Sequence, residues 1–229
     1  MRVLAIGAHP DDIEIYMFGS LAAWKTRGAD LAYAIATDGS RGGAAPADEL
    51  RHTRYAEARA AAAHLQVVPR FLGSADGALV ADAALIASLK QVIAEVRPNI
   101  VVTHAPNDYH GDHRALSDAV RIAASFHVPV LWADTLRGAG FVPTHYVDIT
   151  PHVALKATAI DEHTSQNPER FVAMSEQLGR FRSSQANGPE GTYAEAFRFE
   201  PVYPFVDIRD LLPPAPPVRP VHDRSVKPE

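Results

Sequence analysis

The chain has 229 residues, of which 47% are hydrophobic and 21% are charged, and its formal net charge at pH 7 is −5. A chain of this length and composition can build a hydrophobic core without disulfides or structural metals. The acidic balance predicts no nucleic-acid partner and no anionic membrane surface, and the absence of cysteine excludes disulfides, thiolate metal sites, iron–sulfur clusters and cysteine nucleophiles.

Short apolar runs alternate with helical patterns along most of the chain. The predicted strands are residues 3–8, 31–37, 67–72, 100–104, 128–132 and 144–149, and the predicted helices are residues 13–27, 48–65, 83–96, 112–125, 151–163 and 168–182. This alternation is typical of an α/β protein with a parallel sheet and helices on both faces.

The predicted domain organisation is simple, because no repeat or linker divides the first 210 residues. We expect residues 1–210 to form a single domain and the proline-rich residues 211–229 to form an extended arm, either mobile or lying along a neighbouring surface. An ordered arm favours packing against a partner subunit, and therefore a homo-oligomer.

No apolar run approaches the roughly 20 residues that a membrane-spanning helix needs. The opening segment MRVLAIGAHP is too short for a secretory signal and runs directly into two aspartates. We interpret it as a buried first strand, so the sequence predicts a cytoplasmic protein.

Polar and titratable side chains follow four of the predicted strands. The residues in question are His9, Asp11 and Asp12 after the first, Asp38 after the second, Asp76 after the third, and His104, Asp108, His110, Asp112 and His113 after the fourth. Because ligands bind outside the carboxyl ends of parallel strands, this clustering predicts a functional site at one edge of the sheet.

Two of these segments have the spacing of metal ligands. His9 and Asp12 are three residues apart, and so are His110 and His113 at the start of a helix, where such residues share a face. Two histidines and one aspartate around a cation, with a position left for water, are typical of a catalytic zinc site. Such an N/O ligand set also accepts other divalent metals, such as iron, manganese or cobalt.

The remaining side chains of the two segments suggest a hydrolytic mechanism. Asp11 lies beside the predicted ligands and is the natural general base toward a water activated by the metal. His110 is predicted to stabilise the developing oxyanion or to protonate the leaving amine. Asp112 is predicted to orient the His110 imidazole or keep it charged.

The segment VLAIGAHPDDIEIYMFGS (3–20) resembles the AHPDD-x-E signature of the LmbE-like (PIG-L) zinc-dependent N-deacetylases. The chain is also similar to this family in RYAE (54–57), FLGSADG (71–77) and RPNIVVTHAPNDYHGDHRA (97–115), and TYAEAFR (192–198) is similar to the branch of bacillithiol biosynthesis. The resemblance covers roughly residues 2–200 and implies a Rossmann-like three-layer α/β/α fold with a mostly parallel sheet.

The resemblance also implies a role for each matching residue. His9, Asp12 and His113 match the zinc ligands, Asp11 matches the general base, His110 and Asp112 match the histidine that assists the tetrahedral intermediate and its partner, and Arg54 and Asp76 match sugar contacts. The implied reaction is hydrolysis of an N-acetyl group from an N-acetylglucosamine-like sugar.

This chain departs from the family pattern at three positions. Tyr16 and Phe18 stand where the family often has glycine, and Asp108 stands where some relatives have a tyrosine that helps to bind the oxyanion. The two rings are expected to narrow the pocket or shift the preferred sugar, and the oxyanion donor is left open.

We therefore predict a zinc-dependent N-deacetylase that acts on a small amino-sugar molecule. A zinc amidase that cleaves a larger amide, such as a thiol–sugar conjugate, is the alternative within the same site. A non-catalytic sugar- or nucleotide-binding Rossmann domain is the alternative of a different class, but GAHPDD lacks the G-x-G-x-x-G pattern of dinucleotide folds.

Overall fold

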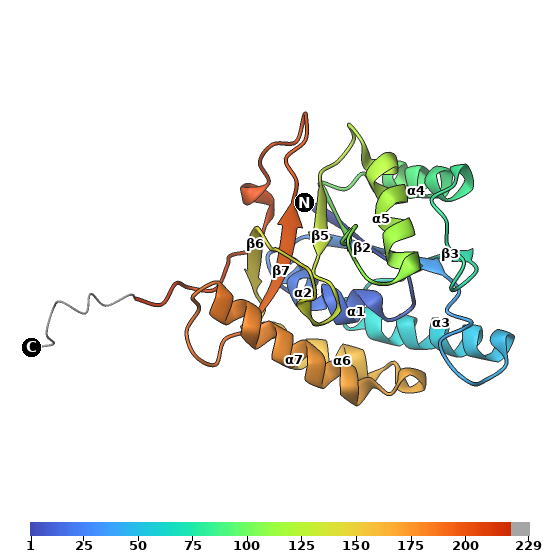
Figure 1. Cartoon of the computed structure of the whole chain (residues 1–229), viewed down its shortest axis with the longest axis horizontal. Helices are drawn as coiled ribbons and strands as arrows, with labels where there is room; N and C mark the ends of the chain where they lie inside the picture. The colour runs from blue at the N-terminus through green and yellow to red at the C-terminus, as the bar shows by residue number, and fades with distance from the viewer. Residues whose placement is uncertain (221–229) are drawn as a thin grey trace, which may run out of the picture.

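The computed structural model describes residues 1–220, whose centre is one seven-stranded sheet with the strand order β3-β2-β1-β4-β5-β7-β6 (Figure 1). Strands β1 to β5 are parallel, and β7 runs antiparallel to both of its neighbours. The predicted mostly parallel sheet is confirmed. The strands are β1 (Arg2–Gly7), β2 (Asp30–Thr37), β3 (Arg70–Ser74), β4 (Ile100–His104), β5 (Val130–Ala133), β6 (His145–Asp148) and β7 (Ala194–Phe199).

Helices cover both faces of this sheet, because successive side chains of a strand point to opposite sides. Leu4 and Ile6 of β1 belong to the core under α4 and α5, whereas Val3 and Ala5 belong to the core under α1, α2, α3 and α6. The three-layer α/β/α architecture follows from these two cores. The helices are α1 (Asp12–Tyr16), α2 (Phe18–Thr26), α3 (Ala47–Ala63), α4 (Ala83–Val96), α5 (Gly111–Ala124), α6 (Val153–Asp161) and α7 (Pro168–Gln185).

The helix predicted over residues 13–27 is instead two helices, which meet at Met17 with a φ of −144°. The cause is the buried carboxylate of Glu195, which accepts hydrogen bonds from the backbone N–H groups of Gly19 at 2.9 Å and Ser20 at 2.8 Å. These are N–H groups at the start of α2, where a continuous helix would bond them to carbonyls four residues earlier.

Strand β7 was not predicted from the sequence. Glu195 and Arg198 interrupt its apolar run, yet Glu195 is buried because it also pairs with Lys156, with 2.6 Å between Oε1 and Nζ. A buried, paired carboxylate removes the apolar pattern by which a strand is recognised.

The described part of the proline-rich arm, up to residue 220, lies against its own chain. The Leu211 carbonyl accepts a hydrogen bond from Trp24 Nε1 at 2.7 Å, and the Pro214 carbonyl accepts one from the backbone N–H of Asp148 in the edge strand β6 at 2.9 Å. Arg219 then pairs with Asn187 through its backbone N–H and carbonyl. The rest of the predicted arm, 221–229, lies outside the described residues.

None of the helices in residues 1–220 is both long enough and apolar enough to cross a membrane.

Candidate metal centre

The candidate site lies where the strand order reverses, at the carboxyl ends of the neighbouring strands β1 and β4. This is the position at which open α/β sheets bind ligands. His9 and Asp12 follow β1, His104 is the last residue of β4, and His113 lies in the first turn of α5. Segments about a hundred residues apart therefore meet at one point, as the sequence predicted.

The three predicted ligands converge in pairs. His9 Nδ1 is 3.2 Å from Asp12 Oδ2, His113 Nε2 is 3.3 Å from Asp12 Oδ1, and His113 Nε2 is 3.2 Å from His9 Nδ1. Zinc–ligand bonds of about 2.0–2.1 Å in a tetrahedron place neighbouring ligand atoms about 3.3 Å apart. The spacing and the chemistry of these donors thus fit one divalent cation.

Further combinations of the same side chains also have donor atoms close enough to share an ion. Among the described residues these are His9 with His110 and His113, Asp12 with His104 and His113, and His9 with Asp76 and Asp112. Each of the three groups contains His9 or Asp12, which follow β1, so all of them belong to one polar centre.

The electrostatics of the centre favour binding a cation. Burial lowers the pKa of His9, but the charge of Asp12 and hydrogen bonds to Asp112, Asp12 and Asp76 raise it by more, to about 12. The pKa of His113 rises to about 9, because burial is again outweighed, by Asp12 and Asp108. In the metal-free protein at neutral pH, both imidazoles are therefore protonated, and a metal ion would have to displace a proton from each ring.

The pKa of Asp12 moves in the opposite direction. Burial raises it, but the surrounding imidazoles, His113 first, lower it by more, and the pKa lies well below its usual value. Asp12 is therefore a carboxylate throughout the neutral range, as a metal ligand must be.

The outer nitrogen of His9 is held by two carboxylates. Its Nε2 is 3.2 Å from Asp112 Oδ2 and 3.3 Å from Asp76 Oδ1. A proton on Nε2 leaves the lone pair on Nδ1, which faces Asp12 and His113, and carboxylates commonly fix a metal-binding histidine in this way. The Asp112 carboxylate is itself fixed by backbone N–H groups of Gly77 and Leu79, at 2.7 and 3.1 Å.

Asp112 was expected to orient His110, and the structure differs here. The Asp112 carboxylate lies on His9, and only its backbone N–H reaches His110, whose Nδ1 accepts that hydrogen bond at 3.2 Å. Because Nδ1 is an acceptor, the neutral His110 ring carries its proton on Nε2. Burial, followed by the charges of His9 and His113, lowers the His110 pKa and favours this neutral form.

Asp108 has a contact that the sequence did not reveal. Its buried carboxylate lies 3.3 Å from Nδ1 of His113 and accepts a hydrogen bond from the backbone N–H of His110 at 2.9 Å. Asp108 is thus placed to orient His113 from behind, as Asp76 and Asp112 orient His9.

The sequence places His104 in the polar cluster but assigns it no role, because a histidine at a strand end is often only structural. The His104 ring is fully buried and stacks on His113, with 3.8 Å between the centroids, and its Nε2 is 3.1 Å from Asp12 Oδ2. The signal that points to it is position, since it ends β4 at the edge where the strand order reverses.

Asp11 is the N-cap residue just before α1, but its side chain makes no capping hydrogen bond. Its Oδ1 instead lies 3.0 Å from Nη2 of Arg54, and Nη1 of Arg54 donates to the Gly39 carbonyl at 3.1 Å.

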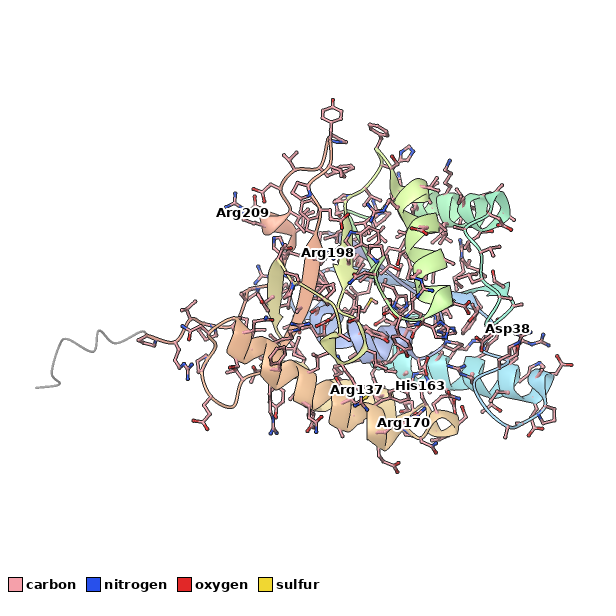
Figure 2. All side chains as sticks on the ribbon, in the orientation of Figure 1. Asp38, Arg137, His163, Arg170, Arg198 and Arg209 are labelled. Carbon is pink, nitrogen blue, oxygen red and sulfur yellow. The ribbon has the colours of Figure 1, made fainter. Side chains whose placement is uncertain are left out.

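Arg54 and Asp76, the two predicted sugar contacts, are both buried beside the centre, 3.8 Å apart at their closest atoms. Asp38 accepts hydrogen bonds from the backbone N–H groups of Ser40 and Asp76 and thereby shapes the loop after β2 (Figure 2).

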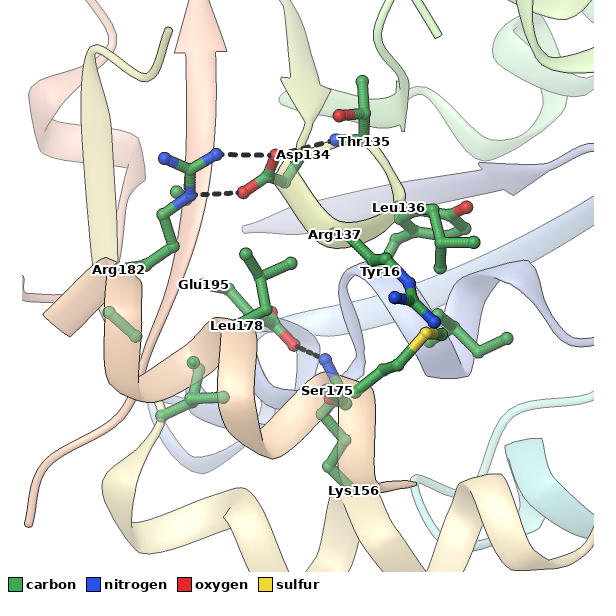
Figure 3. Close-up of a pocket in the computed structure, with 16 residues that line it drawn as sticks. Tyr16, Asp134, Thr135, Leu136, Arg137, Lys156, Ser175, Leu178, Arg182 and Glu195 are labelled. Atoms are coloured by element: carbon green, nitrogen blue, oxygen red, sulfur yellow. Dashed lines mark hydrogen bonds and ion pairs between the residues drawn. The ribbon is translucent and has the colours of Figure 1, made fainter. Parts of the chain in front are cut away.

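Figure 3 shows a pocket lined in part by Tyr16. The pocket adjoins the centre, because the Tyr16 ring also contacts His113. Two buried ion pairs line it. Lys156 Nζ lies 2.6 Å from Glu195 Oε1, and Arg182 binds the Asp134 carboxylate through Nε at 2.6 Å and Nη2 at 3.0 Å. The wall of the pocket is largely apolar and includes Ile15, Leu136, Met174 and Leu178.

A comparison with known families identifies the chain. The PIG-L family, described as GlcNAc-PI de-N-acetylase, matches residues 4–124, which contain every predicted site residue. The chain belongs to the PIG-L family. Within this family it is 30% identical over 222 residues to the diacetylchitobiose deacetylase of Thermococcus kodakarensis, a match that covers 87% of this chain and 83% of that protein. The prediction of a PIG-L-type N-deacetylase is confirmed at the level of family and enzyme class.

Solved structures confirm the PIG-L fold. The N,N'-diacetylchitobiose deacetylase from Pyrococcus horikoshii superposes with a TM-score of 0.79 at 24% identity, over 92% of this chain and 88% of that one. GalB from Pseudomonas putida KT2440, a 4-carboxy-2-hydroxymuconate hydratase, superposes with a TM-score of 0.76 at 22% identity, over 88% and 97%. Since a hydratase shares the fold, the reaction has to be argued from the site.

Proposed function

We propose that this PIG-L protein is a zinc-dependent hydrolase that removes the N-acetyl group from an N-acetylglucosamine-like sugar or glycoside. The observation that carries the proposal is the convergence of His9, Asp12 and His113 beside Asp11, a carboxylate that is not needed as a ligand. The family description and the Thermococcus relative, both concerned with N-acetylglucosamine compounds, support the choice of substrate class.

His9 Nδ1, Asp12 and His113 Nε2 would hold the ion. Bound zinc supplies a Lewis acid that lowers the pKa of a coordinated water to about 7. Asp76 and Asp112 hold His9, and Asp108 holds His113, so the protein fixes the orientation of both imidazoles before substrate binds.

Asp11 accepts the proton of the attacking water. Its Oδ1 is fixed by Arg54, so the carboxylate is held in place without capping the helix. As the new C–O bond forms at the acyl carbon, the carbonyl electrons move to oxygen. When they return, the C–N bond breaks and the amine nitrogen takes a proton.

His110 is proposed to donate a hydrogen bond from Nε2 to the developing oxyanion, because the neutral ring favoured by its lowered pKa has no spare proton to transfer. The amine nitrogen takes the proton that Asp11 accepted from the water. His110 is only partly buried, at the rim of the centre, and its ring meets the His9 ring edge-on with 4.7 Å between the centroids. The hydrogen bond at Nδ1 leaves an N–H on Nε2. Asp112 contributes indirectly, through its backbone bond to His110 and its carboxylate on His9.

Asp76 remains a proposed sugar contact, whereas Arg54, which is buried and paired with Asp11, is proposed to position that carboxylate and not to touch the sugar. Asp76 precedes the exposed turn at Gly77, which lies next to the His9 side of the centre. A cytoplasmic location and a homo-oligomeric state remain predictions from the sequence.

Metal-free protein reloaded with zinc tests the proposal. We expect acetate release from N-acetylglucosamine, diacetylchitobiose or an N-acetylglucosaminide, and no release by Asp11→Asn with its zinc still bound. Cleavage only of amides with larger acyl groups would instead establish the amidase alternative. A protein without stoichiometric metal, whose sugar binding is unchanged in Asp11→Asn, would be a non-catalytic binding domain.

A further inference from the structure

Tyr16 places an aromatic ring directly against the candidate metal centre. It lies four residues after Asp12 on α1, so the two side chains share one face of the helix. The ring is 7% exposed and meets the rings of His113 and His104 edge-on, with centroids 5.7 and 5.2 Å away and interplanar angles of 87° and 83°. The Tyr16 ring therefore forms a wall of the space next to His113.

The Tyr16 hydroxyl has no hydrogen-bond partner within residues 1–220, although more than nine-tenths of the residue is buried. The charges that act on it most strongly are those of Asp12 and Asp108, on the side of the metal centre. Both carboxylates are already engaged, Asp12 with three imidazoles and Asp108 with His113 and the backbone of His110. The hydroxyl hydrogen is therefore left for a group that enters from outside.

The terminal guanidinium nitrogens nearby that have contacts donate to the protein, and Nε of Arg54 is buried without a partner among the described residues. The Arg54 guanidinium binds Asp11 and the Gly39 carbonyl, and Nη1 of Arg114 binds the carbonyls of Asp108 and Tyr109. His110 and Tyr16 flank His113, with their ring centroids 4.8 and 5.7 Å from it. Within residues 1–220, the Nε2–H of His110 and the hydroxyl of Tyr16 are thus two donors beside His113 that no protein acceptor takes up.

We propose that the Tyr16 hydroxyl donates a hydrogen bond to the acyl oxygen of the substrate amide and stabilises the negative charge that develops there during hydrolysis. This inference rests on the proposed amide hydrolysis but not on the identity of the sugar. It gives a function to one of the positions at which the chain departs from the family's glycines. Tyr16 keeps its proton throughout, and the electron pair on the oxyanion returns to expel the amine.

The variant Tyr16→Phe removes only the hydroxyl and keeps the ring. Loss of one oxyanion donor lowers kcat by roughly 10²–10³-fold. Because the bond strengthens in the transition state, we expect kcat to fall by about 100-fold with KM changed less than about threefold. Zinc content should be unchanged. A kcat within about threefold of wild type would overturn the proposal, and so would a variant in which only KM rises.

The matched control is Tyr33→Phe, because Tyr33 in β2 is also buried with a hydroxyl that has no partner. Its kcat should equal that of wild type. The fall caused by Tyr16→Phe should be the same for every N-acetyl amine that the wild-type protein cleaves, since the acyl oxygen is common to all. If the protein deacetylated only N-acetyl amines that contain no sugar, the proposed substrate class would be wrong, but the proposed role of Tyr16 would still stand.

Methylphosphonate, a tetrahedral anion without a sugar, gives a second readout in the zinc-loaded protein. Calorimetric titration should show a Kd about tenfold higher for Tyr16→Phe than for wild type and Tyr33→Phe. Equal values for all three proteins would refute a donor role for Tyr16 even in a protein that cleaved no N-acetyl sugar.

Discussion

Nη2 of Arg54 lies 3.0 Å from Oδ1 of Asp11, and both side chains are buried beneath the loop that follows β2. That loop approaches so closely that a Cβ atom at Gly42 would lie 2.2 Å from Nη1 of Arg54. The glycine thus allows the loop to close over the ion pair, and the proposed general base is held by a cation that is itself shielded from water.

Replacing Arg54 by alanine is expected to damage both stability and activity. Breaking a buried ion pair leaves an uncompensated charge and costs about 3–5 kcal/mol of unfolding free energy. Acetate release should also fall at least tenfold, because Asp11 loses the group that fixes it. Arg51→Ala, which removes an exposed pair with Asp48 on the same helix, is the control and should change the unfolding free energy by less than about 0.5 kcal/mol. Similar urea midpoints for the two variants would contradict this.

Zinc binding at pH 7 should release about two protons, one each from His9 and His113. Their pKa values in the metal-free protein are about 12 and about 9, so both rings are charged at pH 7, whereas both bind metal as neutral rings. The apparent affinity should therefore rise by about 100-fold per pH unit from pH 7 toward pH 9. Calorimetry in buffers of different ionisation enthalpy counts the protons, and a count of zero would show that these imidazoles are not the ligands.

The same pKa shifts predict how the stability of the metal-free protein depends on pH. Both folded pKa values lie above the unfolded value of 6.5, so the protons stabilise the fold fully below about pH 6.5. This stabilisation is lost as the pH rises toward about 9 for His113, and at higher pH for His9. Urea midpoints should fall over this range without zinc and change less with saturating zinc.

His104→Ala is expected to weaken zinc binding without abolishing it. The His104 ring stacks on His113 and lies 3.1 Å from Asp12 Oδ2, so it orients two proposed ligands. Loss of such an outer partner costs about 10–100-fold in metal affinity. His127→Ala is the control, because His127 is exposed beyond the end of α5. A Kd for zinc equal to wild type would show that His104 only fills space.

Ending the chain at residue 212 should destabilise the edge of the sheet without slowing catalysis. This change removes the Pro214 carbonyl that accepts from Asp148 and the pairing of Arg219 with Asn187. At about 1 kcal/mol for each of these three hydrogen bonds, we expect Tm to fall by roughly 6–12 °C. The Asp148 amide should exchange faster with solvent. A chain ending at Pro220 keeps these contacts and is the control, and equal exchange rates in both would contradict the described docking.

The site was more predictable from the sequence than the edge of the sheet beyond β5. His9, Asp12 and His113 follow buried apolar strands whose patterns are local, and parallel strands bring their carboxyl ends together by topology alone. The helix over 83–96 and the strand over 100–104 have the predicted bounds for the same reason. The patterns that reveal these segments are local, although β4 itself pairs with the distant strand β1.

The features that could not be predicted from the sequence depend on contacts between residues far apart in the chain. In the sequence, Glu195 has the character of a surface residue, but in the fold it is buried against Lys156 and the start of α2. Its charge therefore interrupts the apolar pattern of β7, and its hydrogen bonds separate α1 from α2. Asp112 likewise reads as the partner of its neighbour His110 until the fold brings His9 within 3.2 Å of it. Sequence spacing shows which residues share a helix face, but not which of two imidazoles a carboxylate meets across the sheet.

The docking of the arm on β6 has a further consequence. An outermost strand offers free backbone groups on which another polypeptide can align, and proteins block such borders with proline. Here the Pro214 carbonyl takes the Asp148 amide, and the adjoining residues Pro213, Pro216 and Pro217 have no amide hydrogen with which to continue a ladder. At Asp148 the tail thus occupies this border and obstructs strand-by-strand polymerisation there.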